Sequence, residues 1–450
     1  MKPLASLLRT ARLRYTSGSM GSLVAVDGGR SRCRAAVIGA DGRPSPIIEG
    51  PPLPGSLGPG TVEAIVENLA ATVTSAVVAA AAARHEVGQI EVVSAGLAGL
   101  LGSRDVAPAV AARLHDRLGA PRVTLCGDVV AAHAGALPDP DGGVVLVAGT
   151  GAVAFGAVPV KVPDGGGPAA GRRATEREAQ GSGAYGPGVS GPGGHGPGNV
   201  GAGVAGPGGL HQAGHDGRAG VMPGAHGPGA VGSGGHGPGG VGIGGAGPGG
   251  GIWAFDSAVA CVDGWGHLLG DVGSGFWIGR RGLDAALRAH DGRTGGSPVL
   301  ARLVERDVGP LDRLPELAAR AGAGPVAAIA SFSAQVAEAA AAGDDVARHI
   351  WKEAAVHLAD SAVACARRLN PNSASPIAIS WLGGLFSAPD ALLLDPFLAR
   401  IRATFPAADL MPPAGDALAG AARLAAPGTR GALAGLVFDS SSSRPAPVTA

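Results

Sequence analysis

The chain of 450 residues carries 35 basic and 35 acidic side chains, so its formal net charge is zero and its length suits two or three domains. This balance excludes a general electrostatic attraction to nucleic acid or to an anionic membrane. Aromatic residues make up only 3%, which leaves few surfaces on which single-stranded bases could stack. No uninterrupted run of roughly eighteen apolar residues occurs, so we predict no membrane-spanning helix.

The four cysteines are far apart in the sequence, and no C-x-x-C motif occurs. A compact zinc or iron–sulfur site within one chain therefore has no support from the sequence. Isolated thiols fit the reducing cytoplasm, where each cysteine acts as a small core residue. We therefore expect a cytoplasmic protein.

Residues 1–20 contain basic but no acidic side chains, as targeting peptides do. Their apolar part is too short for secretion. We interpret residues 1–20 as a disordered extension, and the sequence leaves open whether Met1 or Met20 starts the protein.

Two short apolar runs, Ser22–Val26 and Arg34–Ile38, predict a pair of strands. The turn between them, residues 27–32, reads Asp-Gly-Gly-Arg-Ser-Arg. Backbone N–H groups of such a turn can surround phosphate oxygens. This turn is the first candidate phosphate site.

A further acid, Asp128, follows a predicted strand and opens a predicted helix. An acid in that position lies at the edge where α/β sheets bind ligands, although it also serves as a simple helix N-cap.

The elements predicted up to this point are a helix at Val62–Arg84 after Thr61, a strand at Ile90–Ala95, a helix at Val106–Leu118, a strand at Val123–Cys126 and a helix at Val129–Leu137.

A second unit of strand, glycine turn and strand covers Val144–Val147, Gly149-Thr150-Gly151 and Ala152–Val158. It mirrors the first unit. Two such turns predict an internally duplicated fold in which two phosphate-binding hairpins face each other across a cleft.

The segment Pro163–Gly251 interrupts this pattern, because it holds 37 of the 80 glycines of the chain. Glycine does not recur at every third position, which excludes collagen. Its low apolar content predicts a disordered insertion placed in a hairpin loop. Its five histidines leave metal binding open as an alternative to a solvated linker.

The stretch Asp263–Gly279 contains six glycines, two tryptophans and two acids, and it leads into a predicted helix start. Trp265 offers a flat apolar face and Asp271 offers two hydrogen-bond acceptors, a combination suited to a hydroxyl-rich ligand. A tight turn that opens a helix is the alternative.

The elements predicted beyond this stretch are helices at Phe276–His290, Leu311–Arg320, Val326–Ala341, Val346–Leu369, Asp390–Ala403 and Asp416–Ala425, a strand at Ile377–Leu382, and a frayed tail at 440–450.

These features, in this order, resemble the actin-like sugar kinase and Hsp70 ATPase superfamily. The segment Gly264–Gly279 (Gly-Trp-Gly-His-Leu-Leu-Gly-Asp-Val-Gly-Ser-Gly-Phe-Trp-Ile-Gly) narrows the resemblance to the N-acetylglucosamine kinase branch of the BadF/BadG/BcrA/BcrD ATPase family. The resemblance implies an α/β fold with two actin-like (ribonuclease H-like) lobes around an ATP cleft. Residues 21–140 would form the N-terminal lobe, and residues 141–439 the C-terminal lobe, interrupted by the insertion at 163–251.

The resemblance also implies roles for the matching residues. Asp27 would organise Mg²⁺ through water, and Asp128 would be the catalytic base in contact with the sugar. The other matches are the first phosphate loop at Gly28, Gly29 and Ser31, the second at Gly149, Thr150 and Gly151, the adenosine turn at Gly383 and Gly384, and the sugar pocket at Gly264, Trp265, Gly266 and Asp271.

Three departures from the family pattern stand out. Arg30 replaces a glycine that family members often have, and Val272 replaces an acid. The loop Pro51–Gly60 lacks the Asn that commonly contacts the sugar, and Ser56 is its only polar side chain. These differences concern phosphate contact and the identity of the sugar.

The resulting hypothesis is an ATP- and Mg²⁺-dependent kinase of the 6-hydroxyl of an amino sugar, with N-acetylglucosamine favoured and its amino-sugar relatives left open. One alternative is an ATPase that energises a partner protein through an iron–sulfur cluster, with Cys126 and Cys261 as ligands. The other is a non-catalytic sugar sensor. The sequence leaves the choice between monomer and homodimer open.

Overall fold

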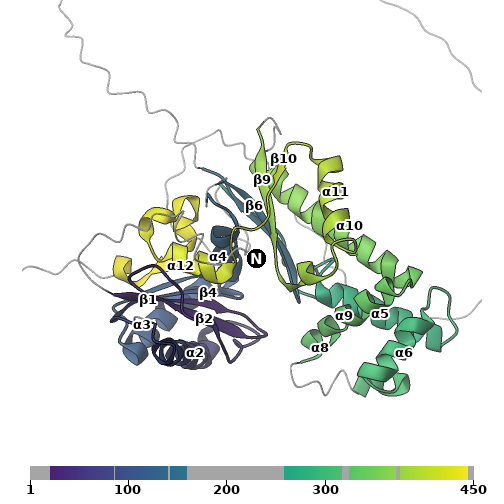
Figure 1. The fold of residues 1–450 in the computed structure, drawn as a ribbon, viewed down its shortest axis with the longest axis horizontal. Helices are drawn as coiled ribbons and strands as arrows, with labels where there is room; N and C mark the ends of the chain where they lie inside the picture. The colour runs from purple at the N-terminus through teal and green to yellow at the C-terminus, as the bar shows by residue number, and fades with distance from the viewer. Residues whose placement is uncertain are drawn as a thin grey trace, which may run out of the picture. The chain divides into compact units, whose positions relative to one another are not determined.

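The structure is a computed structural model that describes residues 21–85, 87–139, 142–159, 258–316, 324–370 and 375–443. The predicted extension at 1–20, the predicted insertion at 163–251 and most of the predicted tail lie outside the described residues. The described chain contains two sheets, one of six strands and one of five (Figure 1).

The N-terminal sheet has the strand order β11-β5-β4-β1-β2-β3. Strands β1, β4 and β5 run parallel, whereas β2, β3 and β11 pair antiparallel with their neighbours. Hydrophobic runs with β-branched residues form these strands. Their bounds are β1 Ser22–Gly28, β2 Cys33–Ile38, β3 Ile48–Gly50, β4 Ile90–Leu97, β5 Arg122–Gly127 and β11 Phe438–Asp439.

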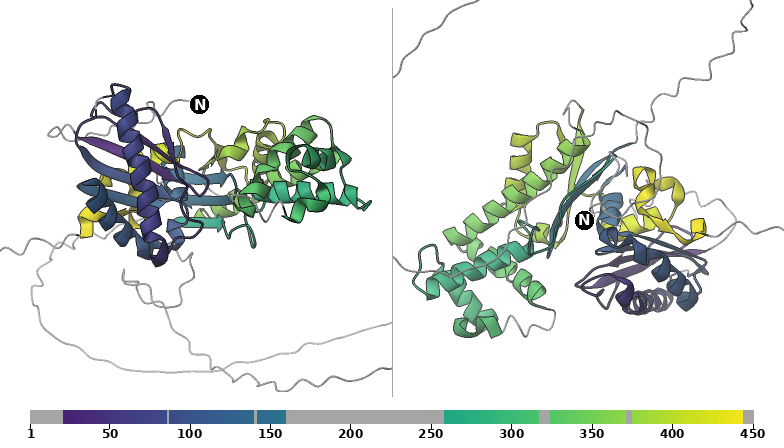
Figure 2. Two further views of the ribbon diagram at one scale, coloured as in Figure 1. Left: turned by 90° about the horizontal axis from the view of Figure 1, so that it is seen from below. Right: turned by 180° about the vertical axis from the view of Figure 1, so that it is seen from behind.

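Helices cover both faces of this sheet, as Figure 1 shows. Helices α2 (Val62–Ala82) and α3 (Ala107–Leu118) pack on one face, and α4 (Asp128–Ala136) and α12 (Ala417–Leu424) pack on the other. The left view of Figure 2 shows the long helix α2 crossing the strands.

Length and composition alone would allow the helical stretch Pro59–Ala82 to cross a membrane. In the structure one face of this helix, which includes Ile65, Leu69 and Val73, is buried in the core of the N-terminal sheet. The stretch is thus a core helix of this lobe.

The C-terminal sheet has the strand order β10-β9-β6-β7-β8 and carries most of its helices on one face. The apolar core between them includes Trp351 and Phe397, both almost fully buried. The elements are β6 Gly143–Ala148, β7 Ala152–Ala157, β8 Val259–Asp263, β9 Ile377–Leu382 and β10 Ala408–Leu410, with α5 Gly275–His290, α6 Pro298–Asp307, α8 Pro325–Ser331, α9 Ser333–Ala341, α10 Asp345–Leu369 and α11 Leu394–Thr404.

The described chain leaves the C-terminal sheet after residue 159 and returns at residue 258 within one antiparallel hairpin. Strands β7 and β8 pair in register with Ala157 opposite Val259, and the Val158 N–H donates to the Ala258 carbonyl at 2.9 Å. Strands β7 and β8 are therefore antiparallel neighbours in one sheet, and the predicted insertion between them lies outside the described residues.

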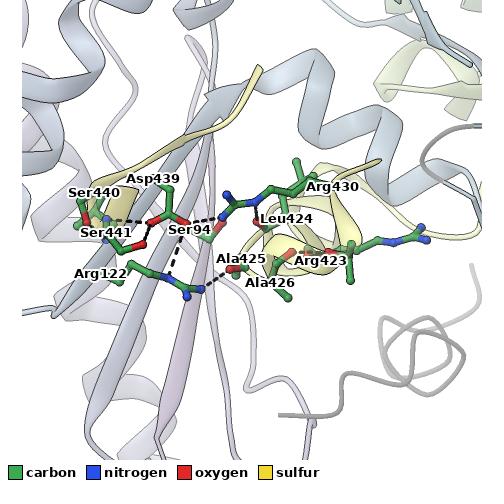
Figure 3. Close-up of polar contacts among 12 residues, drawn as sticks. Ser94, Arg122, Arg423, Leu424, Ala425, Ala426, Arg430, Asp439, Ser440 and Ser441 are labelled. Atoms are coloured by element: carbon green, nitrogen blue, oxygen red, sulfur yellow. Dashed lines mark hydrogen bonds and ion pairs between the residues drawn. The ribbon is translucent and has the colours of Figure 1, made fainter. Parts of the chain in front are cut away.

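The C-terminal segment belongs to the N-terminal sheet, although the sequence prediction placed residues up to 439 in the other lobe. Strand β11 pairs with β5, and Figure 3 shows the polar contacts that hold it there. The buried Arg430 donates to Asp439 at 2.6 Å and to the Leu424 carbonyl at 2.8 Å. Burial alone raises the pKa of Asp439, but hydrogen bonds from Ser441 and Arg430 hold that pKa below its ordinary value.

The first residues of the predicted tail are also tied to this sheet. The Ser440 hydroxyl accepts a hydrogen bond from the Val123 N–H at 2.9 Å, and Ser441 donates twice to Asp439. Residues 440–443 form a short 3₁₀ turn, and residues 444–450 lie outside the described chain.

Helices α4 and α12 pack backbone against backbone. A Cβ added at Gly420 would lie 1.7 Å from the Ala131 carbonyl oxygen, and one added at Gly135 would lie 1.9 Å from the Asp416 carbonyl oxygen. Only glycine, which lacks a side chain, permits this approach. The contact fixes the helix that begins with Asp128.

We expect the replacement Gly420→Ala to destabilise the protein by a net ~1–3 kcal/mol, because overpacking two backbones exceeds the helix-propensity gain of alanine. Thermal unfolding followed by circular dichroism measures the change. Gly428→Ala is the matched control, since a Cβ at Gly428 meets no atom within 4 Å. Equal melting temperatures for wild type and Gly420→Ala would contradict the close helix contact.

Candidate functional site

The first glycine turn is a tight loop between β1 and β2, whose ends pair as Gly28 opposite Cys33. The Gly29 N–H donates to the Arg32 carbonyl at 3.0 Å. A Cβ at Gly29 would lie only 2.7 Å from that same carbonyl oxygen, so the turn requires glycine there. Ser31 is exposed at its tip.

The parallel register of β1, β4 and β5 brings the first turn and Asp128 to the same edge of the sheet. Gly28 lies opposite Leu97, and Leu97 lies opposite Gly127. The residues that follow, including Asp128, therefore emerge at the carboxyl ends of three adjacent strands. That edge is where open α/β sheets bind ligands.

Asp128 is the first residue of α4 and is partly buried. Burial and the nearby charge of Asp27 raise the pKa of Asp128 to about 6, against the opposing effects of the Val129 N–H and the charge of Arg30. The Val129 N–H donates to the Asp128 Oδ1 at 2.9 Å. A carboxyl group with this pKa ionises just below neutral pH, as a general base needs.

Asp27, at the end of β1, is held by an arginine. The Arg34 side chain donates to the Asp27 Oδ2 at 2.6 and 3.1 Å, and its other nitrogen lies 3.1 Å from Asp416. Asp416 in turn caps α12 by accepting from the Ala419 N–H. Arg34 thus joins the first turn to the start of α12.

The surroundings of Asp27 fit a magnesium ion only in a limited way. Among the described residues, no group of three His, Cys, Asp or Glu side chains could hold a metal ion. Mg²⁺ usually keeps several waters and uses one or two carboxylates together with substrate phosphates. Asp27 is a single carboxylate, and its Oδ2 accepts a hydrogen bond from Arg34. It therefore fits an ion that is bound mainly by phosphate groups and that Asp27 contacts through a water molecule.

The second glycine turn, between β6 and β7, is held by the start of α5. The Gly149 N–H donates to the Gly151 carbonyl at 2.8 Å. The Gly275 and Phe276 N–H groups donate to the Gly149 and Thr150 carbonyls at 2.8 and 3.1 Å. Thr150 is exposed at the tip of the turn, in the same position that Ser31 has in the first.

The loop that precedes α5 is shaped by Asp263, which the sequence analysis did not assign as a site residue. The Asp263 carboxylate accepts from the Asp271 N–H at 2.7 Å and the Val272 N–H at 3.1 Å. Both Asp263 and Asp271 have a positive φ, which is uncommon outside glycine. The sequence signal for this role of Asp263 was an acid directly before a glycine. That glycine, Gly264, has a φ of +73° in the structure.

Asp271, predicted to line the sugar pocket, lies against the second turn. A Cβ at Gly151 would be 2.8 Å from the Asp271 Oδ2, and the Asp271 carboxylate accepts from the Ala152 and Gly266 N–H groups. Burial and the charge of Asp263 raise the pKa of Asp271. Asp271 therefore ties the predicted sugar loop to the second turn.

The other residues predicted for the sugar pocket form an open loop. Gly264 and Gly266 have φ values of +73° and +83°, and the Trp265 side chain between them is 57% exposed. More than half of the Trp265 side chain is therefore exposed, as suits a residue that contacts a ligand.

The turn predicted to lie under the adenosine adjoins the second turn. Strands β6 and β9 run parallel with Val147 opposite Leu382. Gly383 has a φ of +111°, and a Cβ there would lie 2.0 Å from the Ala148 carbonyl oxygen. A Cβ at Gly384 would meet no atom within 4 Å, so its backbone is open to a ligand.

The predicted site residues therefore form two groups. Asp27, Gly28, Gly29, Ser31 and Asp128 lie together at the edge of the N-terminal sheet. The group at the C-terminal sheet comprises Gly149, Thr150, Gly151, Gly264, Trp265, Gly266, Asp271, Gly383 and Gly384.

The four cysteines are buried core residues. Burial raises the pKa of Cys33 to about 11 and the pKa of Cys126 and Cys261 to about 12, and it also raises the pKa of Cys365. Metal ligation requires the thiolate. Buried, protonated thiols are poor ligands for a cluster shared between subunits.

Two sheets, each with a glycine turn at its edge, define the actin-like fold of sugar kinases and related ATPases. A protein from Chromobacterium violaceum described as a candidate N-acetylglucosamine kinase has this fold, with a TM-score of 0.55 and 20% identity over 91% of this chain and 100% of that chain. A protein from Porphyromonas gingivalis with the same description has a TM-score of 0.50 and 14% identity over 89% of this chain and 96% of that chain. A search of curated proteins found no match.

The model of the BadF/BadG/BcrA/BcrD ATPase family matches residues 224–420. The predicted two-lobed α/β fold is confirmed by the two sheets and by the likeness to the Chromobacterium violaceum protein.

We expect Asp128→Asn to stabilise the protein at pH 7.5. The folded pKa of Asp128 is about 6, above the ordinary value of 3.8. The folded state therefore binds the proton more tightly, and stability falls as pH rises from 4 through 6. Removing the charge should gain about 1–2 kcal/mol above pH 6 and nothing below pH 4.

Urea unfolding at pH 7.5 and pH 4 measures this difference. Asp312→Asn, which changes an exposed carboxylate, serves as the control with little expected effect at either pH. A loss of stability in Asp128→Asn at pH 7.5 would contradict the raised pKa.

Proposed function

We propose that the protein is an ATP-dependent kinase that phosphorylates the 6-hydroxyl of an amino sugar, most readily N-acetylglucosamine. The observation that carries the proposal is Asp128, a carboxylate with a pKa of about 6 at the same sheet edge as a glycine turn. The match of residues 224–420 to the model of an ATPase family supports the use of ATP. The description of the Chromobacterium violaceum protein supports the choice of sugar.

In the proposed reaction, Asp128 accepts the proton of the sugar hydroxyl while the hydroxyl oxygen forms a bond to the γ-phosphorus. The bond between that phosphorus and the β–γ bridging oxygen breaks, and ADP leaves. Phosphoryl transfer depends mainly on positioning and charge neutralisation. Backbone N–H groups of turns such as Gly29–Arg32 and Gly149–Gly151 are suited to bind phosphate oxygens.

A magnesium ion bound with the nucleotide would supply positive charge to the phosphates. Asp27 would hold that ion through water, and Arg34 keeps the Asp27 carboxylate oriented by its two hydrogen bonds. The Gly383–Gly384 turn would carry the adenosine.

The sugar would bind at the loop of Gly264, Trp265 and Gly266. The exposed indole of Trp265 suits the apolar face of a pyranose ring. Asp271 would have two roles. It would join this loop to the second turn, and it would accept a hydrogen bond from a hydroxyl of the sugar. Because Pro51–Gly60 has no Asn, Ser56 is the polar side chain that this loop offers.

The proposed reaction places the protein in the cytoplasm, where ATP is available. The alternative of an ATPase that energises a partner through a shared cluster is disfavoured by the burial of Cys126 and Cys261.

We expect purified protein to release ADP from Mg-ATP only when a suitable amino sugar is added. A panel of hexoses and amino sugars in a coupled ADP assay measures this, with phosphate transfer to the 6-position checked by NMR. Asp128→Asn should lower kcat by ~10²–10⁴-fold, because it removes the general base. ADP release that ignores every sugar would contradict the kinase and favour the partner-driving ATPase.

We also expect kcat/KM for the sugar to fall as pH drops below about 6, since the pKa of Asp128 is about 6 and protonation removes the base. Initial rates between pH 5 and pH 8 in buffers of constant ionic strength measure the profile. An activity that stays level down to pH 5 would argue that Asp128 is not the base.

A further inference from the structure

The first turn region contains three arginines, and Arg30 differs from the other two in its contacts. Arg32 pairs with Glu49 at 2.5 Å, and Arg34 pairs with Asp27 at 2.6 Å. Arg30 is exposed, and in the part of the chain that the structure describes no carboxylate lies in ion-pair contact with it. The guanidinium of Arg30 is therefore available to an anion.

The Arg30 side chain extends over the end of the neighbouring strand β4. A Cβ at Gly99 would lie 3.1 Å from the Arg30 Nη2. Gly99 has a φ of +88° and follows Ala98, whose N–H donates to the Gly28 carbonyl at 2.8 Å. The guanidinium thus lies beside the carboxyl ends of β1 and β4, at the ligand edge of the sheet.

The same edge carries Asp128. Leu97 at the end of β4 lies opposite Gly127, the residue before Asp128, and a Cβ at Gly96 would lie 3.5 Å from the Asp128 Cα. The charge of Arg30 reaches Asp128, since it lowers the pKa of that carboxyl group. Arg30 is therefore a cation near the first turn and the proposed base.

We propose that Arg30 is a further catalytic residue, which binds the phosphoryl group in transit from ATP to the sugar hydroxyl. This inference rests on the proposed kinase function. As the oxygen–phosphorus bond to the sugar forms and the bond to ADP breaks, negative charge on the phosphoryl oxygens is met by the Arg30 guanidinium. The hydroxyl proton goes to Asp128, so Arg30 neither gains nor loses a proton.

Guanidinium is suited to this task because its fixed N–H donors match phosphate geometry, and it stays charged at every relevant pH. Because Arg30 is exposed and has no ion pair among the described residues, it gives up no such pair when it binds an anion. Arg30 stands where the family often has glycine, so the side chain adds a contact that the backbone turn alone does not provide.

Two variants and a control test the proposal. Arg30→Gln removes the charge but keeps a side chain of similar reach, and Arg30→Lys keeps the charge without the planar fork. Arg113→Ala is the control, because it removes the same charge from an exposed ion pair between Arg113 on α3 and Glu63 on α2. Melting temperatures establish that each variant folds.

Calorimetric titration with Mg²⁺ and a nonhydrolysable ATP analogue, and separately with Mg-ADP, gives a readout that needs no turnover. We expect Arg30→Gln to weaken analogue binding by roughly tenfold or more and to change ADP binding by less than about twofold, because only the analogue has a γ-phosphate. With N-acetylglucosamine, kcat should fall by roughly 10- to 100-fold. Arg30→Lys should recover part of both losses, and Arg113→Ala should match the wild type.

Two outcomes would overturn the role of Arg30. One is analogue affinity and kcat in Arg30→Gln equal to those of the wild type, and the other is an equal loss of analogue and ADP affinity. If no sugar is phosphorylated by the wild type, the proposed function fails while the two titrations still decide whether Arg30 binds the γ-phosphate. Failure of the wild type to bind either nucleotide would overturn both.

Discussion

The contact between α4 and α12 is the constraint on which the rest of the candidate site depends. Two glycines, Gly135 and Gly420, let the helix backbones touch where any side chain would intervene. Helix α4 begins with Asp128, and the cap of α12 is Asp416, which holds Arg34 against Asp27. One close approach of backbones therefore positions both acids of the N-terminal edge.

The charges at this edge are arranged so that the two acids behave differently. Asp27 is bonded to Arg34, whereas Asp128 is partly buried, accepts from the Val129 N–H and senses Arg30 only from a distance. Asp27, which is paired with arginine, suits a site near a metal cation. Asp128, which has no such partner, suits proton transfer. The difference in environment divides two roles between residues of the same type, which is a general device of acid–base sites.

Local pattern was enough to predict both hairpins and the position of Asp128 at the start of α4, because glycine turns and strand runs are encoded by adjacent residues. The return of residues 417–443 to the N-terminal sheet could not be predicted, since pairing of β11 with β5 joins residues more than 300 positions apart. The bond from Arg34 to Asp416 depends on the same long-range packing. The helix α6 was missed although Ser297 caps it, Pro298 begins it, and its buried residues Leu300, Leu303 and Val304 follow a helical spacing.

Strand β11 also bears on how the protein is made. Residues 438–439 complete the N-terminal sheet, yet they leave the ribosome after every strand of the C-terminal sheet. During synthesis the edge of β5 stays without its neighbour, and an exposed edge is a template for pairing with other chains. A nascent chain that ends before residue 438 would keep that open edge permanently, which makes truncated products of this gene prone to aggregate.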